Sequence, residues 1–280
     1  MANERGKSID KTFLSIDNAE ERGFLHRDYI AHCLRWTHVV KWLHQGGRYK
    51  TARILDVGCG KEMPLAKLMH SSRLGPPFYA AADVSKLSMP DQFAKSTWKP
   101  SQLLSECDAA LLKVEELEQQ PNTIVCFEVV EHIEPEHCRR MLANFGKLLE
   151  PEGTAFISTP CWDPDVGAAA NHVNEMTYLA FGALLEDIGW RVEGHWGTFA
   201  SMRDYKDQLP PAHKEVFDAM REYYDSNYLA TIFAPLYPQY SRNCLWQLKW
   251  NPGGARMFPD LRDVEGRWGS SEKWSELLVR

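Results

Sequence analysis

The chain has 280 residues, of which 44% are hydrophobic, so it can bury one large α/β core with insertions. Its net charge of −6 argues against general coating of nucleic acid, and no apolar run approaches the roughly 20 residues of a membrane span. Seven scattered cysteines without a CxxC pair, and no apolar stretch after the first charges, favour a reduced, cytoplasmic protein without zinc, disulfides or a membrane partner.

The first predicted element is an amphipathic helix over residues 27–45. Apolar residues recur at spacings of three and four from Tyr29 to Leu43, and Gly46 and Gly47 end the pattern. Residues 22–53 carry seven Lys and Arg against one acidic residue, with aromatic residues between them. This mixture can hold a nucleotide base or phosphate, although a helix solvated on one side and packed on the other is the more frequent explanation. We treat residues 1–50 as a helical cap on the domain at 51–250.

A strand, a glycine turn and a helix follow over residues 53–70. The apolar strand contains Asp56, and Gly58 and Gly60 let the backbone turn sharply and a ligand approach closely. The third glycine of the dinucleotide fingerprint is absent, which counts against NAD. Asp56 lies where it can meet a cationic group, and a phosphate would avoid it.

A second apolar run, residues 78–82, ends in Asp83 at the distance where a βαβ unit places an acid on ribose hydroxyls. The segments LDVGCG and AADVS together resemble the first two motifs of class I S-adenosylmethionine-dependent methyltransferases. This cofactor has an ammonium group and a ribose but no phosphate. The resemblance implies a cofactor site that includes Asp56, Gly58, Cys59, Gly60, Asp83 and Val84.

The same resemblance extends the cofactor site in both directions. The segment at 106–109 is similar to the third motif of the family, in which an acid approaches the adenine amino group, so Asp108 and Ala109 join the site. Asp108 can equally belong to an acidic surface. In this family a helix before the first strand usually lies over the cofactor, and an arginine or tyrosine on it can bind the methionine carboxylate. This implies roles for Arg35, Tyr29 or His32, although each can equally belong to plain helix surface. We expect residues 89–105 to be helical or irregular.

The fourth strand, residues 123–127, leads into the segment EVVEHIEP, which resembles the EVLEH-type segment of many methyltransferases that act on small molecules. Polar side chains at this point lie where a substrate of a doubly wound sheet binds. If the chain turns helical here, Glu128, Glu131 and His132 share one face. His132 is our candidate for a general base, with Glu128 and Glu131 as further catalytic candidates and Glu128 also near the cofactor.

Two alternatives remain for this segment. Glu128, Glu131, His132 and His172 can form a metal site, because two carboxylates and two imidazoles suit manganese or a similar ion. The small-RNA 3′-terminal 2′-O-methyltransferases have a similar Glu-x-x-Glu-His segment and a later histidine, and residues 171–177 resemble that part. Alternatively, the Glu-His pair only fixes the loop.

The remaining elements complete the predicted fold. A helix begins at Pro135, a turn similar to LLKPGG precedes a strand at 155–159, and a helix around 181–188 leads to strands at 191–197 and 243–250. Cys161 is expected to form a pocket wall. Residues 199–242 are too long for a simple connection, so we predict a tyrosine-rich lid on the substrate side. Residues 251–280 form a tail that packs back or mediates self-association.

The sequence therefore predicts an α/β protein with a doubly wound, seven-stranded, mostly parallel sheet and a helical lid inserted between strands six and seven. The resemblance implies an S-adenosylmethionine-dependent methyltransferase acting on an oxygen or nitrogen of a small molecule or nucleotide. One alternative is a metal-assisted ribose 2′-O-methyltransferase of RNA or nucleotides, and another is a non-catalytic binding or scaffold protein. Nucleic acid as a partner is possible but not favoured, and the oligomeric state stays open.

Overall fold

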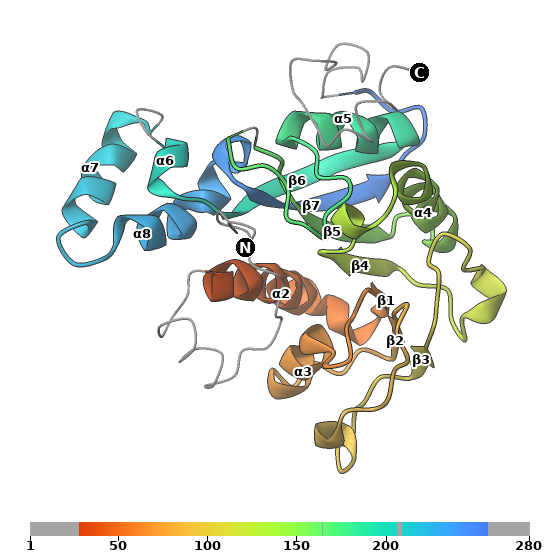
Figure 1. The fold of residues 1–280 in the computed structure, drawn as a ribbon. Helices are drawn as coiled ribbons and strands as arrows, with labels where there is room; N and C mark the ends of the chain where they lie inside the picture. The colour runs from red at the N-terminus through yellow and green to blue at the C-terminus, as the bar shows by residue number, and fades with distance from the viewer. Residues whose placement is uncertain (1–27, 164, 206–208, 257–280) are drawn as a thin grey trace.

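A single seven-stranded sheet in the order β3-β2-β1-β4-β5-β7-β6 organises the chain (Figure 1). The computed structural model describes residues 28–163, 165–205 and 209–256. The strands are β1 (Arg53–Val57), β2 (Phe78–Ala82), β3 (Gln102–Leu104), β4 (Thr123–Phe127), β5 (Thr154–Pro160), β6 (Trp190–Phe199) and β7 (Asn243–Trp250). The first five are mutually parallel, and β7 runs antiparallel to β5 and β6. The predicted fold class is thus confirmed.

Helices cover both faces of this sheet, because its central strands are apolar on both sides. On one face α2 (Asp28–His44) and α3 (Pro64–Ser71) pack against residues such as Ile54, and on the other α4 (Pro135–Leu148) and α5 (Tyr178–Ile188) pack against Leu55 and Val57. This alternation along β1 is the side-chain period of a strand. None of the helices in these described ranges is long and apolar enough to cross a membrane.

The parallel register brings the polar ends of β1, β2 and β4 to one edge of the sheet. Val57 pairs with Ala82 on one side and with Cys126 on the other. The residues that follow these three strands, Gly58, Asp83 and Glu128, therefore emerge close together. In a doubly wound sheet, this edge and this point of strand-order reversal are where ligands bind.

The segment between β6 and β7 is a separate helical lobe. It contains α6 (Met202–Tyr205), α7 (Pro211–Met220) and α8 (Ser226–Phe233), and it projects past α2 at the left of Figure 1. Its own small core includes Phe217, Leu229 and Tyr237. The helical insertion was predicted from its length, and the role of a lid remains a proposal.

Two local expectations can be compared with the structure. The helix at the N-terminal side ends as predicted, because α2 stops at His44 and Gly46 and Gly47 follow with φ of +64° and +69°. The expectation of helix or irregular chain over 89–105 is wrong at its end, where Gln102–Leu104 pairs with Ala80–Ala82 as β3. This edge strand has only three half-buried residues, too few to produce a periodic pattern. The predicted tail from 257 onward and residues 1–27 lie outside the described residues.

Candidate functional site

Two cavities lie at the carboxyl edge of the sheet. The larger has a volume of about 510 Å³ and includes Asp83 and Asp108 in its lining, whereas the smaller, of about 320 Å³, includes Asp56 and Arg35. Both volumes fall in the range of sites for small ligands. Gly58, Glu128 and His132 line both cavities. A ligand that fills both cavities would therefore contact these three residues.

Asp56 gives the smaller cavity a buried carboxyl group. The side chain is 5% exposed and accepts a hydrogen bond from the hydroxyl of Tyr79 on β2. Burial raises the pKa of Asp56 to about 7, against the opposing effect of the Tyr79 hydrogen bond, and the charge of Asp83 adds to the increase. A cation beside Asp56 would stabilise its ionised form. The role of Asp56 beside a cationic ligand group stays a prediction.

The glycine turn after β1 is shaped by contacts on both sides. The amide of Gly58 donates to the carbonyl of Ala82 at 2.8 Å, and its φ of +69° lies in the left-handed region. A Cβ at Gly58 would lie 2.1 Å from Cγ2 of Val129, so any side chain at this position would require Val129 to move. Cys59 and Gly60 continue the turn and line the smaller cavity.

Asp83 fastens this turn to the end of β2. One oxygen of Asp83 accepts from the amide of Gly60 at 2.9 Å, and the other accepts from the amide of Ser85 at 2.8 Å. Asp83 lines the larger cavity together with the predicted residues Val84, Asp108 and Ala109. The residues predicted from the first three motifs are therefore divided between two adjoining cavities.

Arg35 reaches from α2 to the end of β4, where its Nη1 lies 2.7 Å from Oε1 of Glu128. Arg35 is 2% exposed and lines the smaller cavity, as does His32, whose Nδ1 accepts from Nη2 of Arg35. The buried Nε of Arg35 has no hydrogen-bond partner among the described residues. An unpaired buried guanidinium N–H fits an anionic ligand group such as a carboxylate. Tyr29 lines neither cavity.

Glu128 is surrounded by donors. Besides Arg35, it accepts from Oγ of Ser158 at 2.9 Å and from Nδ2 of Asn243 at 2.8 Å. Glu128 adopts a φ of +57°, unusual for a residue with a side chain, before the single 3-10 turn Val130–His132. Since no longer helix forms here, Glu128 does not share a helical face with Glu131 and His132. Its contacts suit an anchor between α2, β5 and β7 better than a proton acceptor.

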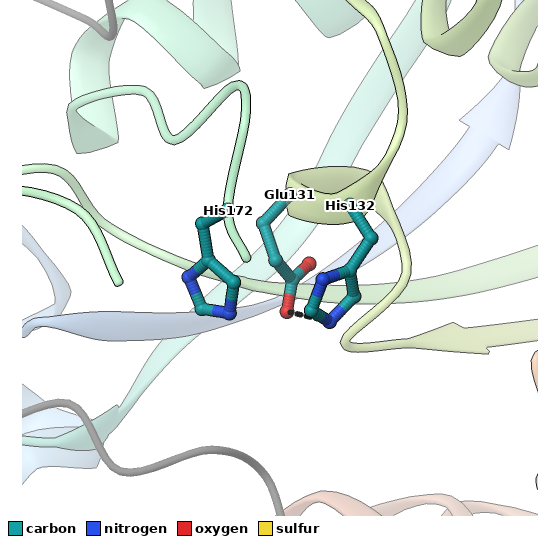
Figure 2. A group of neighbouring side chains, drawn as sticks. All are labelled: Glu131, His132 and His172. Atoms are coloured by element: carbon teal, nitrogen blue, oxygen red, sulfur yellow. Dashed lines mark ion pairs between the residues drawn. The ribbon is translucent and has the colours of Figure 1, made fainter. Parts of the chain in front are cut away.

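Glu131, His132 and His172 form a compact group (Figure 2), of which His132 lines both cavities. One ligand atom from each residue lies within 4.8 Å of the others. Nε2 of His132 is 3.8 Å from Oε1 of Glu131, and the two imidazole rings are 4.7 Å apart between centroids. Glu131 is 1% exposed, whereas the His132 side chain is 33% exposed. Of the four predicted metal ligands, the structure brings these three together, and Glu128 lies outside the group.

The second ring nitrogen of each histidine is held by an acceptor. Nδ1 of His132 donates to the carbonyl of Asn171 at 3.1 Å, and Nδ1 of His172 donates to Oε1 of Glu175 at 2.5 Å. A carbonyl or carboxylate oxygen can only accept, so both imidazoles in their neutral forms carry the proton on Nδ1. Nε2 of each ring is then left with a lone pair. This pattern suits either a general base or a metal ligand.

Sequence reasoning missed several supporting residues. Tyr79 is hidden within an apolar strand, and Asn243 begins β7, 115 residues after Glu128 along the chain. The only local signal was Glu175, three residues after His172 and so within reach of it in a turn. Cys161, expected as a pocket wall, lines neither cavity, and its Sγ lies 3.5 Å from Sγ of Cys244 in the interior.

Comparison with known proteins gives one family match. The model described as "Methyltransferase domain" matches residues 27–210, which is more than half of the chain and contains every residue that lines the two cavities. No curated protein matches the sequence.

Similar solved structures include three bacterial enzymes. Magnesium protoporphyrin IX methyltransferase from Synechocystis PCC 6803 with bound SAH is 12% identical, with a TM-score of 0.49 over 83% of this chain and 93% of that chain. The 1,6-didemethyltoxoflavin-N1-methyltransferase from Burkholderia thailandensis is 14% identical, with a TM-score of 0.48 over 84% and 85%. An S-adenosylmethionine-dependent methyltransferase from Clostridium acetobutylicum ATCC 824 is 9% identical, with a TM-score of 0.49 over 85% and 97%.

Proposed function

The chain belongs to the methyltransferase-domain family, and on this premise we propose that it transfers a methyl group from S-adenosylmethionine to an oxygen or nitrogen of a small molecule or nucleotide. The observation that carries the proposal is that the two cavities share Gly58, Glu128 and His132. The residues of the smaller cavity would hold the amino-acid part of the cofactor, and those of the larger cavity would hold its nucleoside. His132, which lines both cavities, would then lie near the methyl group that the cofactor supplies.

The lining residues match the chemical groups of this cofactor. Asp56 would hold the ammonium group, and the unpaired Nε of Arg35 would hold the carboxylate. Asp83 would accept from the ribose, and Asp108 would accept from the adenine amino group. When bound, the cofactor supplies an electrophilic methyl group on a sulfonium ion. The aligned, partly dehydrated site accounts for much of the expected rate.

His132 is the residue best placed to remove a proton from the acceptor. Its Nε2 carries the lone pair, because Nδ1 is held by the carbonyl of Asn171. A hydroxyl or ammonium acceptor must lose a proton when it is methylated, and histidine is the side chain that most often removes such a proton. Glu131, 3.8 Å away, stabilises the imidazolium that results.

The cofactor part of the proposal is tested by calorimetric titration of S-adenosylmethionine and S-adenosylhomocysteine after removal of copurified ligand. We expect micromolar binding that Asp83→Ala weakens by about 1–3 kcal/mol, the scale of a lost charge-assisted hydrogen bond. The exposed Asp91→Ala serves as a matched control and should bind like the wild type. Absence of binding to the wild type would contradict the proposal and favour the scaffold alternative.

The group in Figure 2 favours a second candidate, metal-assisted methylation of a ribose hydroxyl in RNA or a nucleotide. One carboxylate and two imidazoles, each imidazole oriented by an acceptor on its Nδ1, fit a divalent ion such as Mn²⁺. Glu131, His132 and His172 would hold the ion, which would polarise vicinal hydroxyl groups of the acceptor. This candidate predicts that the apoprotein itself binds Mn²⁺.

Manganese binding can be measured without a methyl acceptor. Binding removes the electron paramagnetic resonance signal of free Mn²⁺, so titration of the wild type and His172→Gln tests the site directly. Binding that His172→Gln abolishes would favour the metal-assisted reaction. If the signal of free Mn²⁺ is the same with both proteins, and activity persists in the presence of a chelator, the metal-assisted reaction is contradicted. His132 would then act as a general base without a metal.

A further inference from the structure

His137 on α4 contacts the carboxylate that we assign to adenine. Both His137 and Asp108 line the larger cavity, and Nε2 of His137 lies 2.9 Å from Oδ1 of Asp108. His137 was not among the residues that the sequence motifs indicated. The contact joins a helix to the irregular segment that follows β3, so it can fix the position of an otherwise half-exposed carboxylate.

A neighbouring arginine fixes the neutral tautomer of His137. Nη2 of Arg140, one turn further along α4, lies 3.2 Å from Nδ1 of His137. A guanidinium has donors only, so Nδ1 of His137 must be the acceptor. The proton of the neutral imidazole is then on Nε2, and Nε2–H donates to Oδ1 of Asp108. The direction of donation is therefore Arg140 to His137 to Asp108.

These contacts use one oxygen of Asp108 and leave the other available. Oδ1 accepts from His137 and also from the amide of Ala110 at 2.9 Å, whereas Oδ2 has no hydrogen-bond partner among the described residues. With Oδ1 held from two directions, the carboxylate cannot rotate freely. Much of the remaining lining is apolar, including Val84, Ala109, Val129, Ile133 and Met141. This surface suits a flat ring with one amino group that donates to Oδ2.

We propose that His137 is a positioning residue that makes the larger cavity select a purine carrying an exocyclic amino group. This inference rests on the proposed function, because it assumes that the larger cavity holds the nucleoside of the cofactor. Exposed ion pairs contribute little to stability, and the His137 and Asp108 side chains are 29% and 41% exposed. The main effect of the contact is therefore on ligand selection and not on folding.

The preference for a purine with an exocyclic amino group is measured by calorimetry with two ligands. These are S-adenosylhomocysteine and its analogue with hydrogen in place of the 6-amino group. We expect the wild type to prefer the amino ligand by about tenfold, as one hydrogen bond to a charged group requires. His137→Phe should reduce this preference to about twofold, with little change in the affinity for the deamino ligand. His137→Gln, whose side-chain amide can still donate, should retain most of the preference.

The controls separate positioning from a structural effect. Asp108→Asn should lose the preference, and Arg140→Met should lower it by about threefold, because Nδ1 of His137 is no longer fixed. An equal loss of affinity for both ligands in His137→Phe, or an unchanged preference in both His137→Phe and Arg140→Met, would overturn the inference while the proposed function stands. Binding of neither ligand by the wild type would overturn both.

Discussion

The guanidinium of Arg35 and the carboxylate of Glu128 lie 2.7 Å apart, with side chains only 2% and 12% exposed. This ion pair joins α2 to the end of β4, and Asn243 extends the contact to β7. Elements from the beginning, middle and end of the domain thus meet at the junction of the two cavities. Movement of α2 would therefore change the wall of the smaller cavity.

This pair should respond to mutation as a buried unit. Arg35→Met leaves Glu128 without its cation and should lower the free energy of unfolding by about 3–5 kcal/mol, measured by urea denaturation. The double variant Arg35→Met/Glu128→Met should lose less than the sum of the two single variants. Arg191→Met, which breaks an exposed pair with Glu193, should cost about 1 kcal/mol at most. Strict additivity would contradict the coupling.

The close packing of the glycine turn against Val129 can be tested by mutation. Gly58→Ala should weaken cofactor binding and destabilise the fold, because the new Cβ would meet Cγ2 of Val129 at 2.1 Å. The variant Gly58→Ala/Val129→Ala relieves this contact and should recover part of the loss. Gly46 has a similar φ, +64° against +69° at Gly58, but no atom lies within 4 Å of a Cβ placed there, so Gly46→Ala isolates the backbone cost of about 1 kcal/mol. No rescue by Val129→Ala would contradict the packing explanation.

Asp56 should make cofactor binding depend on pH. Its pKa is raised to about 7, so the carboxyl group is mostly neutral at pH 6 and half ionised at pH 7. If the ionised form binds the ammonium group, affinity should rise about fivefold over this interval, measured by calorimetry. Asp56→Asn should remove this dependence. A wild-type affinity that is flat between pH 6 and 7 would contradict the assignment.

The same pKa predicts an opposite trend for stability without ligand. The folded pKa is raised above the unfolded value near 4, so the native state binds the extra proton between these values. The contribution of Asp56 to stability is therefore present below about pH 4 and is lost as pH rises to about 7. The difference in unfolding free energy between the wild type and Asp56→Asn should follow this trend. A difference that does not vary with pH would exclude the buried acid as its source.

The two roles considered for His132 predict different patterns of lost activity. As a general base, His132→Gln should lower kcat about 10²- to 10⁴-fold, with a much smaller effect from His172→Gln. In the metal-assisted reaction, both variants should lose comparable activity, and Glu175→Gln should lower Mn²⁺ affinity about 10- to 100-fold. Activity retained in His132→Gln would contradict both roles. The measurement is kcat and KM for any acceptor found by screening.

The cofactor site was predicted mainly from residues that lie close together in the sequence. The supporting residues that were missed are brought to the site by packing between distant segments. Asp56, Gly58 and Asp83 belong to one strand–turn–helix–strand unit, in which chain geometry alone fixes their relative positions. The Arg35–Glu128 pair depends on how α2 crosses the sheet, and Asn243 approaches only after the helical insertion. Such contacts have no period or motif. The short strand Gln102–Leu104 was missed because its three residues are stabilised by pairing with β2.

A crystal structure of the protein with S-adenosylhomocysteine tests the central claim most directly. The claim predicts that the amino-acid end lies between Asp56 and Arg35, the ribose beside Asp83, and the adenine beside Asp108, with the sulfur next to Gly58 and His132. A ligand confined to one cavity, or one with its sulfur away from His132, would contradict the proposed path of methyl transfer.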